Sequence, residues 1–278
     1  MKNILSQIKI SIVVVSLLSA NVIMAQDDEF ENYAFDDDKA QKTPYFALSV
    51  GGNAHFLFMD YNEINKKIGN SEIAKNLHFS GPIIGLGFDF FSAMSPLVNN
   101  ARIGISYFSG KQTKEYDQHI NILNPHDNEV YSLIMNHNRN LSVNNTSVHF
   151  DYAFVPFKSL AILPGIGLKW GSMTLEQYVT VLPRSWDTGA VLVAEPNLFN
   201  EKLEYSYVAI EPQISVEYAI TGFLMLRAAG SYVLPFDNPF HSNVWTINGN
   251  NPYSDVPKSV KPQGFSATIG LYLGLFNY

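Results

Sequence analysis

The sequence contains no cysteine, which excludes thiol catalysis, thiolate metal sites and disulfide bonds. Charged residues are scarce: they make up 15% of the 278 residues, whereas soluble proteins average about 25%. The 18 basic residues are outnumbered by 25 acidic ones and form no cluster, so we expect no nucleic-acid partner. The low charge also argues against an intrinsically disordered chain.

No run of about 18 apolar residues follows position 25, so the sequence predicts no membrane-spanning helix. A mean hydropathy of −0.01 also argues against a bundle of transmembrane helices. Hydrophobic residues nevertheless make up 46% of the chain and aromatic residues 13%. The fold must therefore accommodate many apolar residues that are spread along the chain.

The first 25 residues have the layout of a secretory signal peptide. Lys2 and Lys9 precede a short apolar core at 10–20, and Ala25 supplies the small residue before the cut. Residues 26–43 crowd seven acidic side chains together, a composition that is typical of a disordered, solvated segment. We therefore expect a signal peptide at 1–25, an acidic periplasmic lead-in at 26–43 and a folded domain at 44–278.

From residue 45 onward, apolar residues alternate with small or polar ones in eight separate runs. In one run, for example, Ile84, Leu86 and Phe88 alternate with Gly85 and Gly87. Alternation with a period of two predicts a β-strand with two different faces. Between the runs only 62–76 is expected to form a short helix. The predicted strands cover residues 46–58, 84–90, 101–107, 147–154, 160–170, 208–218, 224–232 and 265–275.

The links between these strands alternate between short and long. An even strand count with short links at one end and long links at the other is typical of an outer-membrane barrel. We predict an all-β fold, an eight-stranded antiparallel transmembrane β-barrel with short periplasmic turns and long extracellular loops. Residues 130–135 and 174–181 still partly alternate, so strands are expected to project beyond the membrane. The predicted long links are 60–78, 110–145, 173–204 and 235–262.

Seven charged residues fall on the small and polar faces of the strands. A lipid-facing Arg or Lys would cost about 2–4 kcal/mol near the bilayer midplane, so these faces are expected to point inward. An eight-stranded barrel is only wide enough inside for side chains, and buried charges persist when they are paired. We predict a lumenal charge network that fills the barrel, with His55, His149 and Gln213 at its edges; a proton or ion path is the alternative. The predicted network consists of Asp89, Arg102, Asp151, Lys169, Glu211, Glu217 and Arg227.

Aromatic residues gather near the predicted strand ends, where the interface between lipid and water favours them. We expect them to form two girdles. The girdle on the long-loop side contains Phe56, Phe58, Tyr61, Tyr107, Tyr205, Tyr207, Tyr232 and Phe236. The girdle on the short-turn side contains Phe90, Phe91, Phe154, Phe157, Tyr218 and Phe223.

The last predicted strand resembles the closing strand of outer-membrane barrels, because it ends on Tyr278 with Phe276 two residues before it. The whole domain resembles small bacterial outer-membrane barrels of the OmpA/OmpX-like or PorT-like type. The resemblance implies export to the outer membrane, assembly by the barrel-assembly machinery through the C-terminal strand, and contact with outer-membrane lipid and lipopolysaccharide. A PorT-like barrel would be an accessory of a secretion or uptake complex.

No constellation of catalytic residues stands out. His241 and Ser242 are adjacent, so on a strand they would point to opposite faces, which does not fit the spacing of barrel lipid A deacylases. His119, His126 and His137 share the longest link without the spacing of a metal motif. We expect no catalytic, cofactor or metal site.

Function is then expected to lie in the long loops, as it does in many proteins that carry loops on a rigid scaffold. The favoured hypothesis is a non-enzymatic barrel with a structural or surface-binding role. The alternatives are an accessory barrel that binds a partner of a secretion or uptake complex and, third, a lipid-A-modifying enzyme.

Overall fold

The computed structural model describes residues 45–68, 71–94, 97–123, 130–183, 199–238, 244–247, 250–253 and 261–277. The chain divides into two compact units, Met1–Thr43 and Pro44–Tyr278, and all of the described residues belong to the second. The predicted signal peptide and acidic lead-in lie outside the described residues.

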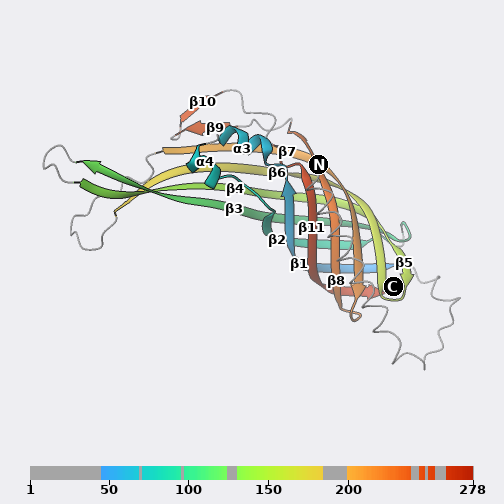
Figure 1. The fold of residues 1–278 in the computed structure, drawn as a ribbon. Helices are drawn as coiled ribbons and strands as arrows, with labels where there is room; N and C mark the ends of the chain where they lie inside the picture. The colour runs from blue at the N-terminus through green and yellow to red at the C-terminus, as the bar shows by residue number, and fades with distance from the viewer. Residues whose placement is uncertain are drawn as a thin grey trace. The chain divides into compact units, whose positions relative to one another are not determined.

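The second unit is a closed β-barrel, as the alternation together with the sorting of short and long links predicted (Figure 1). Each of its eight long strands pairs antiparallel with the next, and the last pairs with the first from Phe46↔Asn277 to Met59↔Gly264. Closure leaves no free edge around the wall of the barrel. The barrel strands are β1 (Phe46–Met59), β2 (Ile83–Ala93), β3 (Ala101–Leu123), β4 (Val130–Tyr152), β6 (Leu160–Pro183), β7 (Phe199–Ala219), β8 (Leu224–Asp237) and β11 (Gly264–Asn277).

Five short elements lie in the described parts of the links. The predicted helical segment forms two helices, α3 (Asn62–Ile68) and α4 (Glu72–Asn76), between β1 and β2. The remaining three are strands, β5 (Phe154–Phe157), β9 (Val244–Ile247) and β10 (Asn250–Tyr253). Within the residues that the structure describes, every helix is too short or too polar to cross a membrane.

Four neighbouring strands are much longer than the others. β3, β4, β6 and β7 have 23, 23, 24 and 21 residues, whereas the other four barrel strands have 11 to 14. Their added length extends away from the barrel as a sheet, which we call the projecting sheet (Figure 1). At its β7 edge the short strand β9 pairs with Glu201–Glu204. The projection that the partial alternation predicted is therefore confirmed.

The links that we predicted over 110–145 and 173–204 are largely strand instead. β3 and β4 stay paired as far as Leu123↔Val130, and β6 and β7 as far as Val179↔Phe199. The connecting segments shrink to 124–129 and 184–198, which lie outside the described residues. The prediction was wrong there because strand pairing uses backbone groups and does not require an apolar face once the strands leave the membrane.

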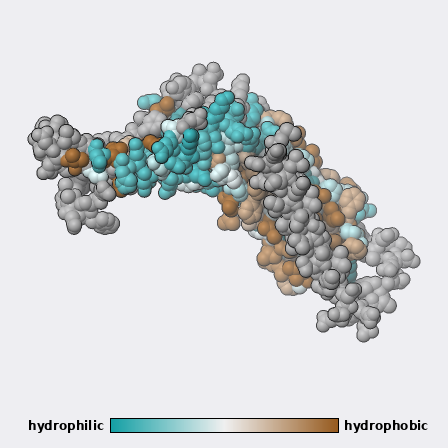
Figure 2. Space-filling view, viewed as in Figure 1, coloured by the Kyte–Doolittle hydropathy of each residue, from teal (hydrophilic) through white to brown (hydrophobic). Residues whose placement is uncertain are grey.

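Inside and outside residues alternate along the barrel strands. Apolar side chains such as Leu86, Ile105 and Leu168 are more than half exposed on the outside, and Figure 2 shows an apolar barrel wall next to a hydrophilic projecting sheet. An exposed apolar wall around a closed sheet is the surface that faces lipid. The seven charged residues predicted for the lumen lie on the opposite, inner face.

Two apolar clusters lie inside the barrel, one toward each end. The loop-end cluster, toward the projecting sheet, includes Leu141 and Tyr205 together with Ile64 of α3. Asn65 ties the β1–β2 link over this end, because its amide exchanges two hydrogen bonds of 2.9 Å with the backbone of Phe79. The turn-end cluster comprises Tyr45, Ala47, Phe91, Ala153, Ala161, Leu163, Met225 and Tyr272.

Several strand glycines lie against large lumenal side chains, which explains their positions. A Cβ atom on Gly51 would lie 2.3 Å from the ring of Tyr272 and 2.4 Å from a backbone oxygen. A Cβ atom on Gly165 would lie 2.0 Å from a carboxylate oxygen of Asp151. Glycine at these places lets a neighbouring strand carry a bulky inward residue.

We predict that Gly51→Val prevents assembly of most of the protein, whereas Gly52→Val does not. The neighbouring Gly52 faces outward, and a Cβ atom there would have its nearest contact at 3.9 Å. The folded fraction is measured by heat-modifiable migration after refolding into detergent. Equal folded fractions for the two variants would contradict the close packing of Gly51 against Tyr272.

Candidate functional site

The seven charged residues of the predicted network all lie inside the barrel, and each is less than a tenth exposed. They come from six neighbouring or facing strands. Their positions follow from strand phase, because each occupies the face opposite to the exposed aliphatic residues of its own strand. The contributing strands are β2 (Asp89), β3 (Arg102), β4 (Asp151), β6 (Lys169), β7 (Glu211, Glu217) and β8 (Arg227).

Arg102 is the centre of the larger group of contacts. Its Nε and Nη2 atoms donate to Oδ2 of Asp151 at 3.0 and 2.5 Å. Its Nη1 atom donates to Glu217 and, at 3.2 Å, to the hydroxyl of Tyr45. The guanidinium also lies 4.1 Å from the centroid of the Phe91 ring. A planar, forked donor set is what lets one arginine join two carboxylates.

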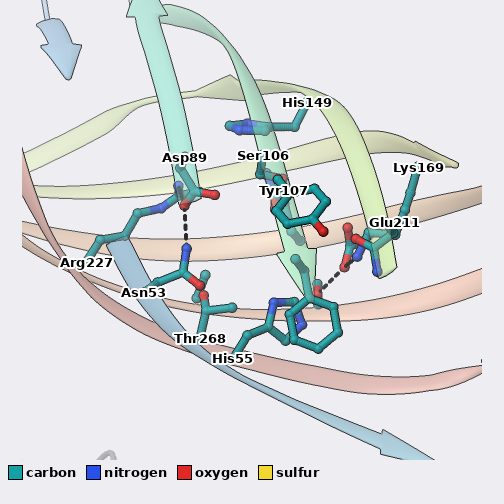
Figure 3. A pocket seen from close by; sticks show the side chains of 15 residues that line it. Asn53, His55, Asp89, Ser106, Tyr107, His149, Lys169, Glu211, Arg227 and Thr268 are labelled. Carbon is teal, nitrogen blue, oxygen red and sulfur yellow. Dashed lines mark hydrogen bonds and ion pairs between the residues drawn. The ribbon is translucent and has the colours of Figure 1, made fainter. Parts of the chain in front are cut away.

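Arg227 extends this group across the lumen. Its Nε lies 3.5 Å from Glu217, so Glu217 is shared by two arginines. Its Nη1 donates to Oδ2 of Asp89 at 3.4 Å. Asp89 also accepts a hydrogen bond from the amide of Asn53 at 3.0 Å (Figure 3). A further hydrogen bond to Asp89 comes from the hydroxyl of Tyr272 at 2.5 Å.

Lys169 and Glu211 form a second group. The ammonium of Lys169 lies 2.7 Å from Oε1 of Glu211, which also accepts from Ser231 at 2.7 Å. His55 lies on the same side of the lumen, where its ring stacks on Phe108 with centroids 4.0 Å apart. Nε2 of His55 is 2.5 Å from the hydroxyl of Ser266.

The three predicted edge residues differ in their partners. Nδ1 of His149 is 3.0 Å from Asp151, and Gln213 donates to the same carboxylate at 2.6 Å. His55 contacts Phe108 and Ser266 instead of a charged residue. Sequence reasoning missed Tyr45 and Tyr272 as partners of the network, although Tyr272 shares the polar phase of its strand.

Between the two groups lies a small polar cavity of about 40 Å³ (Figure 3). This volume holds at most a few water molecules. In the part of the chain that the structure describes, apolar clusters flank the charged layer on both sides. The arrangement is suited to pairing buried charges within a packed barrel interior.

Four of the aromatic residues predicted for the girdles point into the barrel instead. Tyr61, Tyr205, Tyr207 and Phe91 are almost fully buried in the two apolar clusters. These predictions were wrong because they considered how close each residue lies to the end of a strand and not which face of the sheet its side chain occupies. Outward-facing members include Phe58, Phe90, Tyr107, Phe154, Phe157, Tyr218, Phe223, Tyr232 and Phe236.

The projecting sheet carries a network of amides on the face that continues the outer wall. Thr113 donates to Asn140 at 2.9 Å, Asn136 donates to Asp117 at 2.5 Å, and Asn138 donates to Asn136. The first two contacts join β3 to β4 beyond the barrel, and the third lies within β4. They give the projecting sheet a polar surface held by cross-strand pairs.

The opposite face of the projecting sheet holds Arg139, which is 5% exposed. Its Nε donates to Gln177 at 2.7 Å, and its Nη1 has no hydrogen-bond partner among the described residues. Burial lowers the pKa of Arg139 to about 10, so the group stays charged at neutral pH. Partial burial, with the charge of Arg139, also lowers the pKa of His137, which is therefore neutral at pH 7.

The histidines that the sequence analysis considered as metal ligands lie apart or outside the described residues. His, Asp and Glu side chains do not form a group of three that could hold a metal ion in the described part of the chain. His119 and His137 lie on β3 and β4 of the projecting sheet. His126, His241 and Ser242 lie outside the described residues.

No family model and no curated protein matches the chain. Among solved structures, the chain is similar to Ail, the attachment invasion locus protein of Yersinia pestis, in complex with the heparin analogue sucrose octasulfate. The two chains are 7% identical with a TM-score of 0.35, and the match covers 84% of this chain and 99% of Ail. A major outer membrane protein from Thermus thermophilus is similar at 11% identity and a TM-score of 0.41, covering 82% and 99%. The Escherichia coli outer membrane protease OmpT is similar at 10% identity and a TM-score of 0.26, covering 84% and 96%.

The closed sheet of this chain defines its class of protein. An even number of antiparallel strands, an apolar outer wall and a charged interior are the features of a small outer-membrane β-barrel. The chain is therefore an eight-stranded barrel of the outer membrane.

We predict that Arg102→Met lowers the free energy of unfolding by about 3–5 kcal/mol, because it leaves Asp151 and Glu217 buried without their cation. The matched control is Lys202→Met, which removes the solvent-exposed ion pair of Lys202 with Glu204 and should cost less than about 1 kcal/mol. Urea unfolding in lipid vesicles measures both. Similar losses for the two variants would show that the lumenal pairs do not hold the barrel together.

Proposed function

We propose that the protein is a non-enzymatic outer-membrane barrel whose projecting sheet binds a partner at the cell surface. The observation that carries this proposal is the continuous pairing of β3, β4, β6 and β7 for many residues beyond the wall of the barrel. Membrane crossing needs only about 9–11 residues per strand. The additional length therefore serves a purpose outside the membrane.

One edge of the projecting sheet supports a role in binding. The pairing of β2 with β3 ends at Ile84↔Lys111, so β3 from 112 to 123 pairs with β4 alone among the described strands. A strand edge of this kind presents backbone donors and acceptors to an added strand. The charges of Lys114, Glu115 and Asp117 restrict unspecific pairing at the same edge.

The lumen supports a structural role instead. Its charged residues contact one another, and apolar clusters flank them among the described residues. In the proposed function, the packed interior stabilises the barrel and the projecting sheet binds the partner.

We predict that a photo-crosslinking residue at His119 traps a protein partner on intact cells, whereas one at Leu168 does not. His119 is exposed on the projecting sheet and Leu168 is exposed on the lipid-facing wall. Adducts are detected by their change in mass after purification. Protein adducts of equal yield at both positions, or at neither, would contradict binding by the projecting sheet.

A second variant tests the same proposal by competition. Replacing 115–138 with Asn-Gly joins the paired residues Lys114 and Arg139 through a two-residue turn and leaves the barrel pairs intact. Untagged full-length protein should reduce the His119 adduct at least five-fold, and the shortened variant should not. A partner that stays bound through purification in mild detergent would instead favour the accessory barrel of a secretion or uptake complex.

We also predict that overproduction leaves the mass spectrum of lipid A unchanged, because a non-enzymatic barrel would neither add nor remove an acyl chain. The measurement compares lipid A from cells with and without the overproduced protein. Gain or loss of an acyl chain that depends on the protein would establish the lipid-A-modifying alternative.

A further inference from the structure

The register of the barrel strands places three kinds of residue at three depths on the outer wall. One row across β3, β4, β6 and β7 is aliphatic: Ile105, Val148, Leu168 and Ile210. The next row toward the projecting sheet contains Tyr107, Thr146, Trp170 and Val208. The row after that is polar: Ser109, Asn144, Ser172 and Ser206. The change from aliphatic through aromatic to polar marks the boundary between lipid and water.

A groove of about 280 Å³ lies at this boundary. Thr146 forms its floor between Tyr107 on one neighbouring strand and Trp170 on the other. Because adjacent strands are about 4.8 Å apart, the two aromatic residues start from positions roughly 10 Å apart. Tyr107 is 49% exposed and Trp170 is 43% exposed. A small residue between two large ones therefore creates a slot that is open to the outside.

The polar groups of the groove are suited to a neutral, hydroxyl-rich ligand. Side chains of Asn144, Thr146 and Ser172 line it and make no hydrogen bond with any other described side chain or backbone group through their side-chain atoms. Amides and hydroxyls both donate and accept, as sugar hydroxyls do. None of the lining residues is charged, so a phosphate would find no cation there.

The aromatic side walls of the groove and its position at the membrane boundary restrict the chemistry of the ligand further. Flat aromatic faces pack against the apolar C–H face of a pyranose ring, while the ring hydroxyls turn toward amides and hydroxyls. An acyl chain can continue from the groove over the aliphatic row at Ile105, Val148 and Leu168. A ligand with both parts is a lipid that carries a sugar.

We propose that this groove binds the neutral saccharide head group of a membrane glycolipid. The site is formed by Tyr107, Asn144, Thr146, Trp170 and Ser172, and the acyl chains lie along the wall below it. The proposal does not depend on the function proposed for the projecting sheet, since it uses the wall of the barrel alone.

The experiment uses the full barrel in nanodiscs that contain equal amounts of monoglucosyl diacylglycerol and phosphatidylglycerol. Lipids that remain bound after transfer to detergent are counted by native mass spectrometry. We expect the glucolipid to be retained at least ten-fold more than phosphatidylglycerol. Equal retention of the two lipids would overturn the proposal.

Two variants separate a saccharide site from simple aromatic anchoring. Thr146→Trp fills the slot and should abolish the preference for the glucolipid. Phe236→Ala is the matched control, because Phe236 lies in the same row next to Val208 but outside the groove, and it should keep the preference. Loss of the preference in both variants would show that the preference does not depend on this groove and would overturn the proposal.

A third measurement identifies the source of the sugar. Methyl glucoside is added to the nanodiscs at millimolar concentration before extraction. We expect it to displace less than a tenth of the bound glucolipid, because it lacks the acyl chains that contact the wall. Full displacement would make the groove a site for soluble sugar and would overturn the assignment to a lipid. Heat-modifiable migration verifies that each variant is folded.

Discussion

Closure of the sheet with eight strands is the constraint on which the rest of the structure depends. A ring of this size has an interior only as wide as the side chains that point into it, so each inward residue must fit against residues from facing strands. Glycine at 51 and 165 provides room for Tyr272 and Asp151. Arg102 can therefore reach Asp151 on the neighbouring strand and Glu217 on a more distant one. The ion pairs are a consequence of narrow closure, because charges in such a space must find partners.

Closure of the sheet also gives the interior and the outer surface of the barrel different roles. The interior of the described barrel contains paired charges between two apolar clusters, which leaves it packed. The wall is apolar where it meets lipid and polar where strands continue beyond it. Tyr107 and Trp170 lie at the change between these two regions, and the buried Arg139 lies above it on the opposite face. Partners from the lipid and from the aqueous side would thus meet different parts of the same strands.

The sequence was sufficient to predict which face of its strand a charged residue occupies. Alternation placed Asp89, Lys169 and Arg227 on inward faces, and the structure has them there. Alternation could not predict which residues form ion pairs across the lumen. The contact between Arg227 and Asp89, for example, depends on the tilt of the strands and the curvature of the barrel. Tyr205 and Tyr207 were misplaced although their phase was visible, because closeness to the strand end was given more weight. The extent of strand pairing within 110–145 was underestimated. Polar strands beyond the membrane do not show the apolar alternation by which a strand is recognised in sequence.

The groove and the projecting sheet are linked by one register. Pairing between β3 and β4 is unbroken from Ala101↔Tyr152 to Leu123↔Val130, and it includes Tyr107↔Thr146 on the way. A shift of one residue in this pairing would turn every side chain of one strand to the other face, which would place charges such as Asp151 in lipid and remove the aromatic walls of the groove. The inward ion pair of Arg102 with Asp151, which are direct partners in the register, opposes such a shift. The lumenal contacts therefore also hold the outer surfaces at a constant depth relative to the membrane, so that a packed interior determines what the exterior presents.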